Sequence, residues 1–348
     1  MTVYRRFKEV KCPEWDPSKL GNSYFTREIF KCSDYRLLPT ASPIVVAKCC
    51  AIVSCCLERQ RLCIVNVTPT RQLKSFTSEA AYEIVDKKLS KYVGSDFTMN
   101  SLKDDKDLIK EGICYLINDV TVLFASKAKR TKDRLVGGLS ELVSDERYIY
   151  KDALGGFELR GPVTFIMNIT AESYQKNKER MIGSTLLERT LTIYDSFSMQ
   201  EAEEWTIKEE RAKHTVFKYP TISYDDIETR IKEIPHHFLR LINIRAREFS
   251  HLSMRSFVGT QDIIKSLLRS HAALNQRKRV CFDDFYFLSL IKPYLVDPFN
   301  PTESRIIQLR GQGMGYTKIC EEIKWPSTCR QQVKRIILKA KMRGILLT

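Results

Sequence analysis

Four short apolar segments constrain the fold of this chain more than any other feature of its sequence. They lie at residues 63–67, 113–123, 163–167 and 191–194. Each is a nearly continuous apolar run, which is the pattern of a strand buried on both faces of a parallel sheet. Because helical patterns separate these runs, the sequence predicts an α/β fold built around a doubly wound parallel sheet.

Apolar residues at helical spacing lie before, between and after the predicted strands. Helices are predicted at residues 43–60, 77–92, 133–143, 184–188, 201–211, 262–274 and 283–294. In the second of these, Ala80, Ala81, Ile84, Val85 and Leu89 share one face. The strand patterns stop after about residue 200, so an all-helical part is expected to follow the sheet.

These patterns divide the chain into four parts. Residues 1–42 are polar, contain three prolines and are expected to be an irregular lead-in with a short helix at 25–30. Residues 43–200 form the α/β core and residues 201–298 the helical part. A proline-containing turn then leads into a small basic unit at residues 299–348.

The charge of the chain is unusual for a soluble protein of this composition. It has 57 Lys and Arg residues against 42 Asp and Glu residues, a net charge of +15. Such an excess favours a polyanionic partner such as nucleic acid. A basic protein that merely tolerates its charge is the alternative explanation.

No membrane-spanning or targeting segment is predicted. The most apolar stretch, residues 43–57, is interrupted by Lys48 and is too short to cross a bilayer as a helix. Without a secretory signal, the eleven cysteines predict reduced thiols in a reducing, cytoplasmic compartment. Metal binding by these cysteines is disfavoured, because the chain has no CxxC pair and no histidine lies near them in sequence.

The loop after the first predicted strand has the layout of a phosphate-binding P-loop. The sequence TPTRQLKS follows a strand, ends in Lys-Ser and precedes a helix, as in the pattern G-x-x-x-x-G-K-[ST]. The candidate nucleotide-binding residues are Thr68, Pro69, Thr70, Arg71, Gln72, Leu73, Lys74 and Ser75. Thr68 and Leu73 occupy the two glycine positions, and the branched side chain of Leu73 hinders the approach of backbone N–H groups to phosphates.

Four further motifs follow in order along the chain. YLIND ends in Asn118 and Asp119, where a Walker B strand places its carboxylates. The strand at residues 163–167 ends in Asn168, and a predicted short helix places Arg189 after it. SHAALNQRKRVCFDDFYFL at residues 270–288 completes the series.

In this order and spacing, residues 43–295 resemble an AAA+ ATPase of the minichromosome-maintenance-helicase type. The resemblance implies a doubly wound sheet followed by an all-helical lid, with nucleotide between them at an interface of a homo-oligomer. It implies ATP and Mg²⁺ as cofactors, Ser75 and Asn118 as metal ligands, and Asp119 to polarise water. Asn168 would be sensor 1 and Arg189 an arginine finger.

The departures from this pattern predict a degenerate nucleotide site. Asn118 has no charge, although Mg²⁺ prefers carboxylate ligands. The carboxylate of Asp119 starts about 1.5 Å further back than that of a glutamate. The lid motif places a sensor 2 arginine near Gly259 or Thr260, and Arg255 is out of register.

The basic unit at residues 299–348 is predicted to contain three helices. It holds ten Lys and Arg residues against three acidic residues, a net charge of +7. Helices are expected at 302–309, at 316–323 and from Ser327 to about Met342. This layout resembles the helix-turn-helix and winged-helix modules, which implies binding of double-stranded DNA in the major groove. The candidate contacts are Ser327, Thr328, Arg330, Gln331, Lys334 and Arg335. A solvated basic helix on a small packing domain is the alternative.

A second basic stretch, SKAKRTKDR at residues 126–134, follows the Walker B-like strand. In a ring it would face DNA, and a solvated loop is an equally good interpretation.

The function expected from the sequence is therefore DNA binding by an AAA+-like protein with a degenerate nucleotide site. The first alternative is an active ATP-driven helicase or translocase ring. The second is a transcription regulator that binds no nucleotide.

Overall fold

The computed structural model of this protein describes most of the chain. The described residues are 15–32, 37–57, 61–68, 75–94, 100–120, 129–152, 155–183, 186–195, 199–213, 218–230, 234–253, 256–295 and 301–342.

Five parallel strands form the central sheet. They are β1 (Cys63–Thr68), β2 (Ser90–Val93), β3 (Ile113–Ile117), β6 (Val163–Thr170) and β7 (Thr190–Tyr194). Their spatial order is β2-β3-β6-β1-β7, so β6 lies between β1 and β3. The prediction of an α/β fold with a parallel sheet is confirmed, and the four apolar runs are four of its strands.

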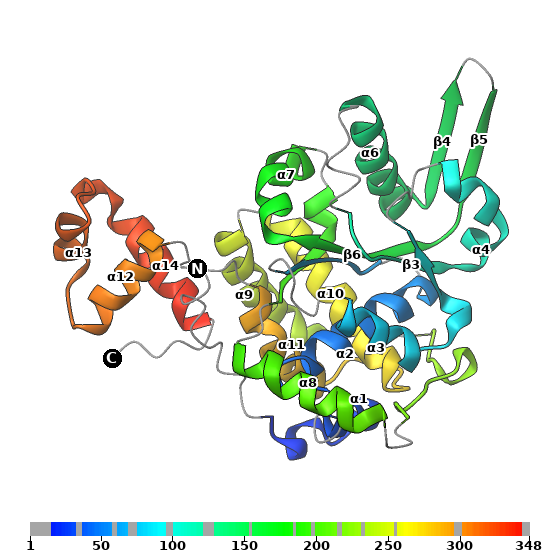
Figure 1. Ribbon diagram of the computed structural model, residues 1–348, viewed down its shortest axis with the longest axis horizontal. Coiled ribbons are helices and arrows are strands. Elements are labelled where there is room, and N and C mark those ends of the chain that lie inside the picture. Colours follow the sequence, from blue (N-terminus) through cyan, green and yellow to red (C-terminus); the bar gives the residue numbers. More distant parts are fainter. Residues whose placement is uncertain are drawn as a thin grey trace.

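Helices cover both faces of this sheet (Figure 1). One layer contains α2 (Ser42–Val53), α3 (Phe76–Ile84), α9 (His236–Ser253), α10 (Phe257–Leu274) and α11 (Phe282–Ile291). The opposite layer contains α4 (Lys106–Glu111), α6 (Lys129–Asp145) and α7 (Ala171–Gly183). Strand side chains alternate between the layers: Ile64 and Ile166 pack in the first, Val65 and Phe165 in the second. Double coverage is the reason that these strands are apolar at nearly every position.

The N-terminal segment is part of the core. Helix α1 (Tyr24–Lys31) includes the short helix expected there, and Phe25, Ile29 and Phe30 are buried. They pack in the same apolar cluster as α2 and α10. The residues expected to form a lead-in therefore help to hold the helical part on the sheet.

The predicted helix at residues 77–92 is wrong in its second half. Helix α3 ends at Ile84, and residues 90–93 form the edge strand β2, which pairs with β3. After α3, Asp86 caps a 3-10 turn, η5 (Lys87–Leu89), by accepting a hydrogen bond from the backbone N–H of Lys88 at 3.0 Å. Val85 and Leu89 are buried as expected, but through the turn rather than a helix face. The apolar spacing therefore predicted which residues are buried. The backbone conformation of residues 90–93 depends on their pairing with β3.

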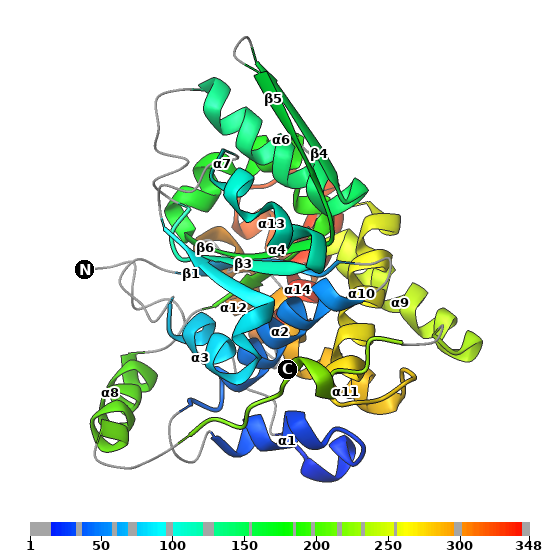
Figure 2. The ribbon, with the colours of Figure 1, turned by 90° about the vertical axis from the view of Figure 1, so that its right-hand side faces the viewer.

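A β-hairpin that the sequence analysis did not anticipate precedes β6. Strands β4 (Arg147–Asp152) and β5 (Gly155–Arg160) pair antiparallel, and the hairpin extends away from the sheet (Figure 2). The rings of Tyr150 and Phe157 stack across it with centroids 5.1 Å apart. The pattern of β4 mixes charged and aromatic residues, so it lacks the apolar signal of the central strands.

The basic segment at 126–134 is not a loop where it is described, because α6 begins at Lys129. The predicted helix at 184–188 is instead a 3-10 turn, η7 (Leu186–Arg189). Helix α8 (Met199–Lys213) confirms the helix expected at 201–211. Within the described residues no helix has the length and apolar character needed to span a bilayer.

The C-terminal unit has three helices, as predicted. They are α12 (Pro301–Gly311), α13 (Tyr316–Glu322) and α14 (Arg330–Met342), and a 3-10 turn (Ser327–Cys329) precedes the last. The unit has its own apolar core, formed by Ile306, Leu309, Ile319, Cys320, Val333, Ile336 and Ile337. At the end of α14, Met342 packs with the main core. Figure 1 shows the unit beside the α/β body, with α14 nearest to it.

Gly161, which joins the hairpin to β6, is expected to be essential for stability. Its φ is +148°, and a Cβ there would lie 1.9 Å from the carbonyl oxygen of Ile109. We expect Gly161→Ala to lower the free energy of unfolding by at least about 2 kcal/mol through backbone strain and overpacking. Gly137→Ala in α6 is the control, because nothing lies within 4 Å of its added Cβ. Urea titrations that give equal stabilities for both variants would contradict this account.

Candidate functional site

The carboxyl ends of the central strands bring the predicted motifs to one edge of the sheet. Thr68 at the end of β1 pairs in register with Thr170 of β6, and Asn66 pairs with Asn168. The backbone N–H of Val120, just beyond Asn118 and Asp119, donates to the carbonyl of Asn168 at 3.1 Å. The P-loop-like strand and the Walker B-like strand therefore flank β6, which carries the predicted sensor. In open α/β sheets this edge is where ligands bind.

Asn168 is fully buried and lies inside a polar network. Its Oδ1 accepts a hydrogen bond from Asn66 Nδ2 at 3.1 Å, and its amide contacts Ser78 Oγ in α3 at 3.1 Å. Asn66 Nδ2 also donates to Thr68 Oγ1 at 3.3 Å. These contacts connect β1, β6 and α3. In this conformation the Asn168 amide supports the loop ends rather than facing solvent.

Lys48 of α2 extends this network by hydrogen bonds to the start of α3. Its ammonium donates to Thr77 Oγ1 at 2.6 Å and to Ser78 Oγ at 2.9 Å, in the first turns of α3. The lysine is 0% exposed, and burial lowers its pKa to about 7 against the opposing effect of Asp195. In the sequence, the signal for this buried ammonium is a lysine within an otherwise apolar helix. The same lysine also argues against a membrane span.

Asp195, the residue after β7, is a buried acidic residue beside this network. Its backbone N–H donates to the carbonyl of Val67 at 2.9 Å, which places it beside the end of β1. Burial raises the pKa of its carboxyl to about 7, although Lys48 and the Asn66 amide favour the charged form. Neither carboxyl oxygen has a hydrogen-bond partner among the described residues. The sequence analysis missed Asp195, even though a carboxylate at a strand end is a recognisable signal.

Only the two ends of the predicted phosphate loop are described. Thr68 is buried, and its hydroxyl accepts the hydrogen bond from Asn66. Ser75 is half-buried at the N-cap of α3, where its carbonyl accepts the N–H of Ser78 at 3.0 Å and that of Glu79 at 2.8 Å. Its side chain makes no capping hydrogen bond. The candidate residues Pro69, Thr70, Arg71, Gln72, Leu73 and Lys74 lie outside the described residues.

The two candidate residues after β3 are half-buried. The Oδ1 of Asn118 is buried without a hydrogen-bond partner in the described part of the chain, so it is an acceptor in need of a donor or cation. Asp119 adds one carboxylate and Ser75 one hydroxyl. No group of three or more His, Cys, Asp or Glu side chains arranged for a metal ion occurs among the described residues. Mg²⁺ is held in proteins mainly by carboxylates and substrate phosphates, and of these three candidate residues only Asp119 carries a carboxylate.

Arg189 lies in η7, but its guanidinium is engaged within the chain. Its Nη1 donates to the carbonyl of Ser140 in α6 at 2.9 Å. Next to it, Gly259 of α10 packs so closely that a Cβ would lie 2.9 Å from the carbonyl oxygen of Glu188. In the isolated chain Arg189 therefore joins η7 to α6. A role as an arginine finger would require this hydrogen bond to be released.

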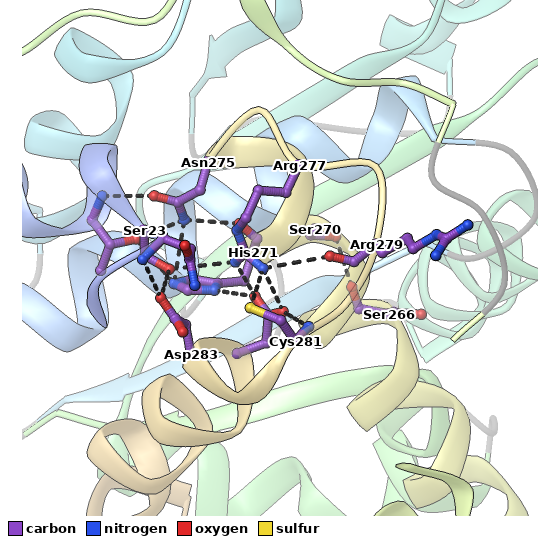
Figure 3. Close-up of polar contacts among 12 residues, drawn as sticks. Ser23, Ser266, Ser270, His271, Asn275, Arg277, Arg279, Cys281 and Asp283 are labelled. Atoms are coloured by element: carbon purple, nitrogen blue, oxygen red, sulfur yellow. Dashed lines mark hydrogen bonds and ion pairs between the residues drawn. The ribbon is translucent and has the colours of Figure 1, made fainter. Parts of the chain in front are cut away.

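A second polar network joins α1 to the turn between α10 and α11 (Figure 3). His271 Nδ1 lies 2.6 Å from Asp284 Oδ1, and its Nε2 lies 2.9 Å from Thr26 Oγ1. Arg277 binds both oxygens of Asp284, at 2.6 and 3.0 Å. The order hydroxyl, imidazole, carboxylate is that of a catalytic triad, but all three side chains are 0 % exposed. Burial lowers the pKa of His271, and we assign this network to the attachment of the N-terminal segment.

The predicted DNA-contact residues lie together on one side of the C-terminal unit. Ser327, Thr328, Arg330, Gln331 and Lys334 are exposed, and Arg335 is half-buried. On the opposite side of α14, Val333, Ile336 and Ile337 pack into the core of the unit.

Neighbouring contacts hold this surface in place. The Lys334 ammonium and the Arg310 guanidinium both lie over the ring of Tyr316, 5.7 and 5.0 Å from its centroid. Lys339 forms an ion pair of 2.9 Å with Glu303, which ties α14 to α12. The connection between α13 and α14 spans residues 323–329, longer than the three to four residues typical of a helix-turn-helix.

Comparison with known proteins adds no relative: no protein-family model matches the chain, and no curated protein does.

The buried Lys48–Asp195 pair is expected to give stability an unusual dependence on pH. The folded pKa values of both groups are about 7, whereas the ordinary values are 10.5 and 3.8. Between pH 4 and 7 the folded chain holds one proton more than the unfolded chain, so stability falls as the pH rises. Between pH 7 and 10 it holds one fewer, so stability rises. The contribution of the pair therefore has a minimum near pH 7.

The measurement is the free energy of unfolding against pH for the parent and for Lys48→Met/Asp195→Asn. The difference between the two curves should vary by on the order of 3 kcal/mol across this range, with its extreme near pH 7. Lys176→Met/Glu172→Gln is the control, because that pair is 70 and 72% exposed. A difference curve for the buried pair as flat as the control curve would show that the two groups titrate normally.

Proposed function

We propose that the protein binds double-stranded DNA through its C-terminal unit, which acts as a helix-turn-helix module. The observation that carries this proposal is the surface of α14. A helix packed by Val333, Ile336 and Ile337 presents Arg330, Gln331 and Lys334 to solvent. Arginine and glutamine are the side chains that bind guanine and adenine edges with two hydrogen bonds, and a recognition helix places such residues in the major groove.

Phosphate contacts come from the same surface. Ser327 and Thr328, in the 3-10 turn that precedes α14, are exposed and carry hydroxyl groups. Such groups bind phosphate oxygens and orient a helix on the duplex. The net charge of +7 in this unit adds the attraction that releases counterions.

We further propose that the α/β body is an AAA+-like module with a degenerate nucleotide site. Its support is the position of β6 between β1 and β3, which brings Thr68, Asn118 and Asn168 to one edge. A nucleotide bound at this edge would be near the N-terminus of α3. Two observations favour weak or absent hydrolysis: Asn118 stands where a carboxylate is needed, and Arg189 is held by Ser140. When bound, ATP and Mg²⁺ would supply a phosphoanhydride bond and the cation that neutralises its charge.

The DNA proposal is tested with full-length protein and a labelled duplex by fluorescence anisotropy. Arg330→Gln/Lys334→Gln should weaken binding at least about tenfold at ~0.1 M salt and reduce the slope of log K against log salt by about 2. Lys103→Gln/Lys110→Gln removes the same charge from exposed positions of the body and should have little effect. Equal losses in both variants would mean that binding follows net charge and not α14.

The nucleotide site is tested by ATP titration and by an ATPase assay with and without duplex DNA. We expect weak ATP binding that Lys74→Ala abolishes and Leu73→Gly strengthens, since glycine frees the backbone approach to phosphates. Asn118→Asp/Asp119→Glu should raise turnover more than affinity, because these positions serve metal placement and water activation. Binding that survives Lys74→Ala would exclude the P-loop assignment. Rapid DNA-stimulated turnover by the parent would instead favour an active motor.

A further inference from the structure

Helix α8 presents an acidic face to solvent. Glu203, Ile207 and Glu210 are exposed, and the apolar Ile207 is 53% exposed. Because they are four and three residues apart, they lie on one face of the helix, with the two glutamates about 10.5 Å apart along its axis. The opposite face holds α8 on the body, where Trp205 packs edge-on against Phe76 of α3 with ring centroids 5.2 Å apart. The face with the two glutamates is therefore turned away from the body.

Further contacts fix this orientation of α8. Thr40 Oγ1 donates a hydrogen bond to Glu201 Oε1 at 2.6 Å. The ammonium of Lys208 donates to the carbonyl of Leu37 at 3.3 Å and forms an ion pair of 3.0 Å with Glu204. The charge of this lysine is thus used on the inner side of the helix. Over its length α8 has five acidic residues against three basic ones, a net charge of −2.

Helix α9 has the same pattern with the opposite charge. Arg240, Ile244 and Arg247 are exposed, and Ile244 is 52% exposed. Their spacing is again four and three residues, so the two arginines are also about 10.5 Å apart along one helix face. The opposite face is buried in the main apolar core through Phe238, Ile242, Ala246 and Phe249. Over its length α9 has three arginines against one glutamate, a net charge of +2.

The acidic residues of α9 and of its neighbour α10 are already paired. Glu248 binds Arg245 at 3.0 Å and Lys292 at 2.7 Å. In α10, Asp262 lies 3.4 Å from Lys265. Neither helix therefore offers an unpaired carboxylate to the two exposed arginines of α9.

The two faces cannot meet within one chain. Figure 2 shows α8 and α9 at opposite sides of the α/β body. Each face leaves an isoleucine in water between two like charges, and each would be complemented by the pattern that the other carries. Nucleic acid could bind the arginines of α9 but would be repelled by the glutamates of α8, whereas a second copy of the chain accounts for both faces.

We propose that α8 of one copy of this chain packs on α9 of a second copy. The two exposed glutamates of α8 pair with the two exposed arginines of α9, and Ile207 lies against Ile244 between them. The equal spacing of the charges allows both ion pairs to form at once. Because the two faces differ and lie on opposite sides of the chain, the contact is head-to-tail and leaves one face of each outer copy available for a further copy. The inference does not rest on DNA binding, on nucleotide binding or on the AAA+ resemblance.

Self-association is measured by sedimentation velocity on the full-length protein without DNA or nucleotide. The parent should associate at about 100 µM and dissociate on dilution to about 1 µM, as expected for a small interface. Raising the salt concentration to about 0.5 M should weaken the association, because the paired charges lie at the surface. Ile207→Ala/Ile244→Ala should weaken it at least about tenfold through lost apolar burial.

Charge reversal tests the pairing directly. Glu203→Arg/Glu210→Arg makes both faces basic, and Arg240→Glu/Arg247→Glu makes both faces acidic. Each variant alone should be monomeric, because its two faces repel each other between copies. An equimolar mixture of the two variants should associate again, since every face then meets a face of opposite charge. This recovery also shows that both variants are folded.

The controls make the same charge changes at exposed positions before and within α4. Asp104→Arg/Glu111→Arg and Lys103→Glu/Lys110→Glu should associate as the parent does. A parent that stays monomeric at about 100 µM would overturn the inference. Reversal variants that associate like the parent, or a mixture of them that stays monomeric, would also overturn it.

Duplex binding, measured in parallel on dilute protein, separates this inference from the proposed function. Loss of duplex binding in Arg240→Glu/Arg247→Glu with unchanged self-association would overturn the inference and assign the face of α9 to nucleic acid. Failure of the parent to bind duplex would refute the DNA proposal and leave the association experiment unaffected, because that experiment contains no DNA.

Discussion

Burial of the parallel sheet on both faces is the constraint on which the rest of this structure depends. Side chains on both sides of β1, β3 and β6 pack against helices, so polar groups on these strands have no water to bind. Such groups must find partners in the protein or in a ligand. Asn66, Asn168 and Asp195 are such groups, and they lie at the same edge because the strands are parallel.

The polar network beneath this edge fixes the start of α3. Ser78 and Thr77 of α3 are bound by Lys48, and Ser78 is bound by Asn168. The start of α3 is therefore held from inside the core whether or not a phosphate binds outside it. Burying an ammonium and a carboxyl costs desolvation free energy, and for Lys48 the hydrogen bonds to Thr77 and Ser78 offset part of that cost. We infer that the network fixes the loop-to-helix junction.

The N-terminal segment is also held by buried polar groups that hydrogen-bond to one another. Thr26, His271 and Asp284 are fully buried and hydrogen-bonded in series, and Arg277 neutralises the carboxylate. Because every member has a partner, the network specifies one arrangement of α1, α10 and α11. The C-terminal unit, in contrast, is defined by its own small apolar core and presents polar groups on the outside of α14.

The sequence by itself determined the class of fold, four of the five central strands and the three C-terminal helices. These elements are local: an apolar run of strand length or an amphipathic helix shows its burial pattern in its own residues. It also identified Thr68, Asn118 and Asn168 as polar residues near the carboxyl ends of strands, although β6 continues past Asn168 to Thr170.

Only the tertiary structure decided the order of the strands, and with it which of these groups meet. Edge strand β2 and the hairpin β4–β5 are stabilised by pairing with distant residues or with each other, so their own patterns were weak. The partners of Lys48 and the attachment of Arg189 to Ser140 join residues far apart in the chain. Hydrogen bonds between distant segments leave no periodic trace in the sequence, and that is why the buried network was found only in three dimensions.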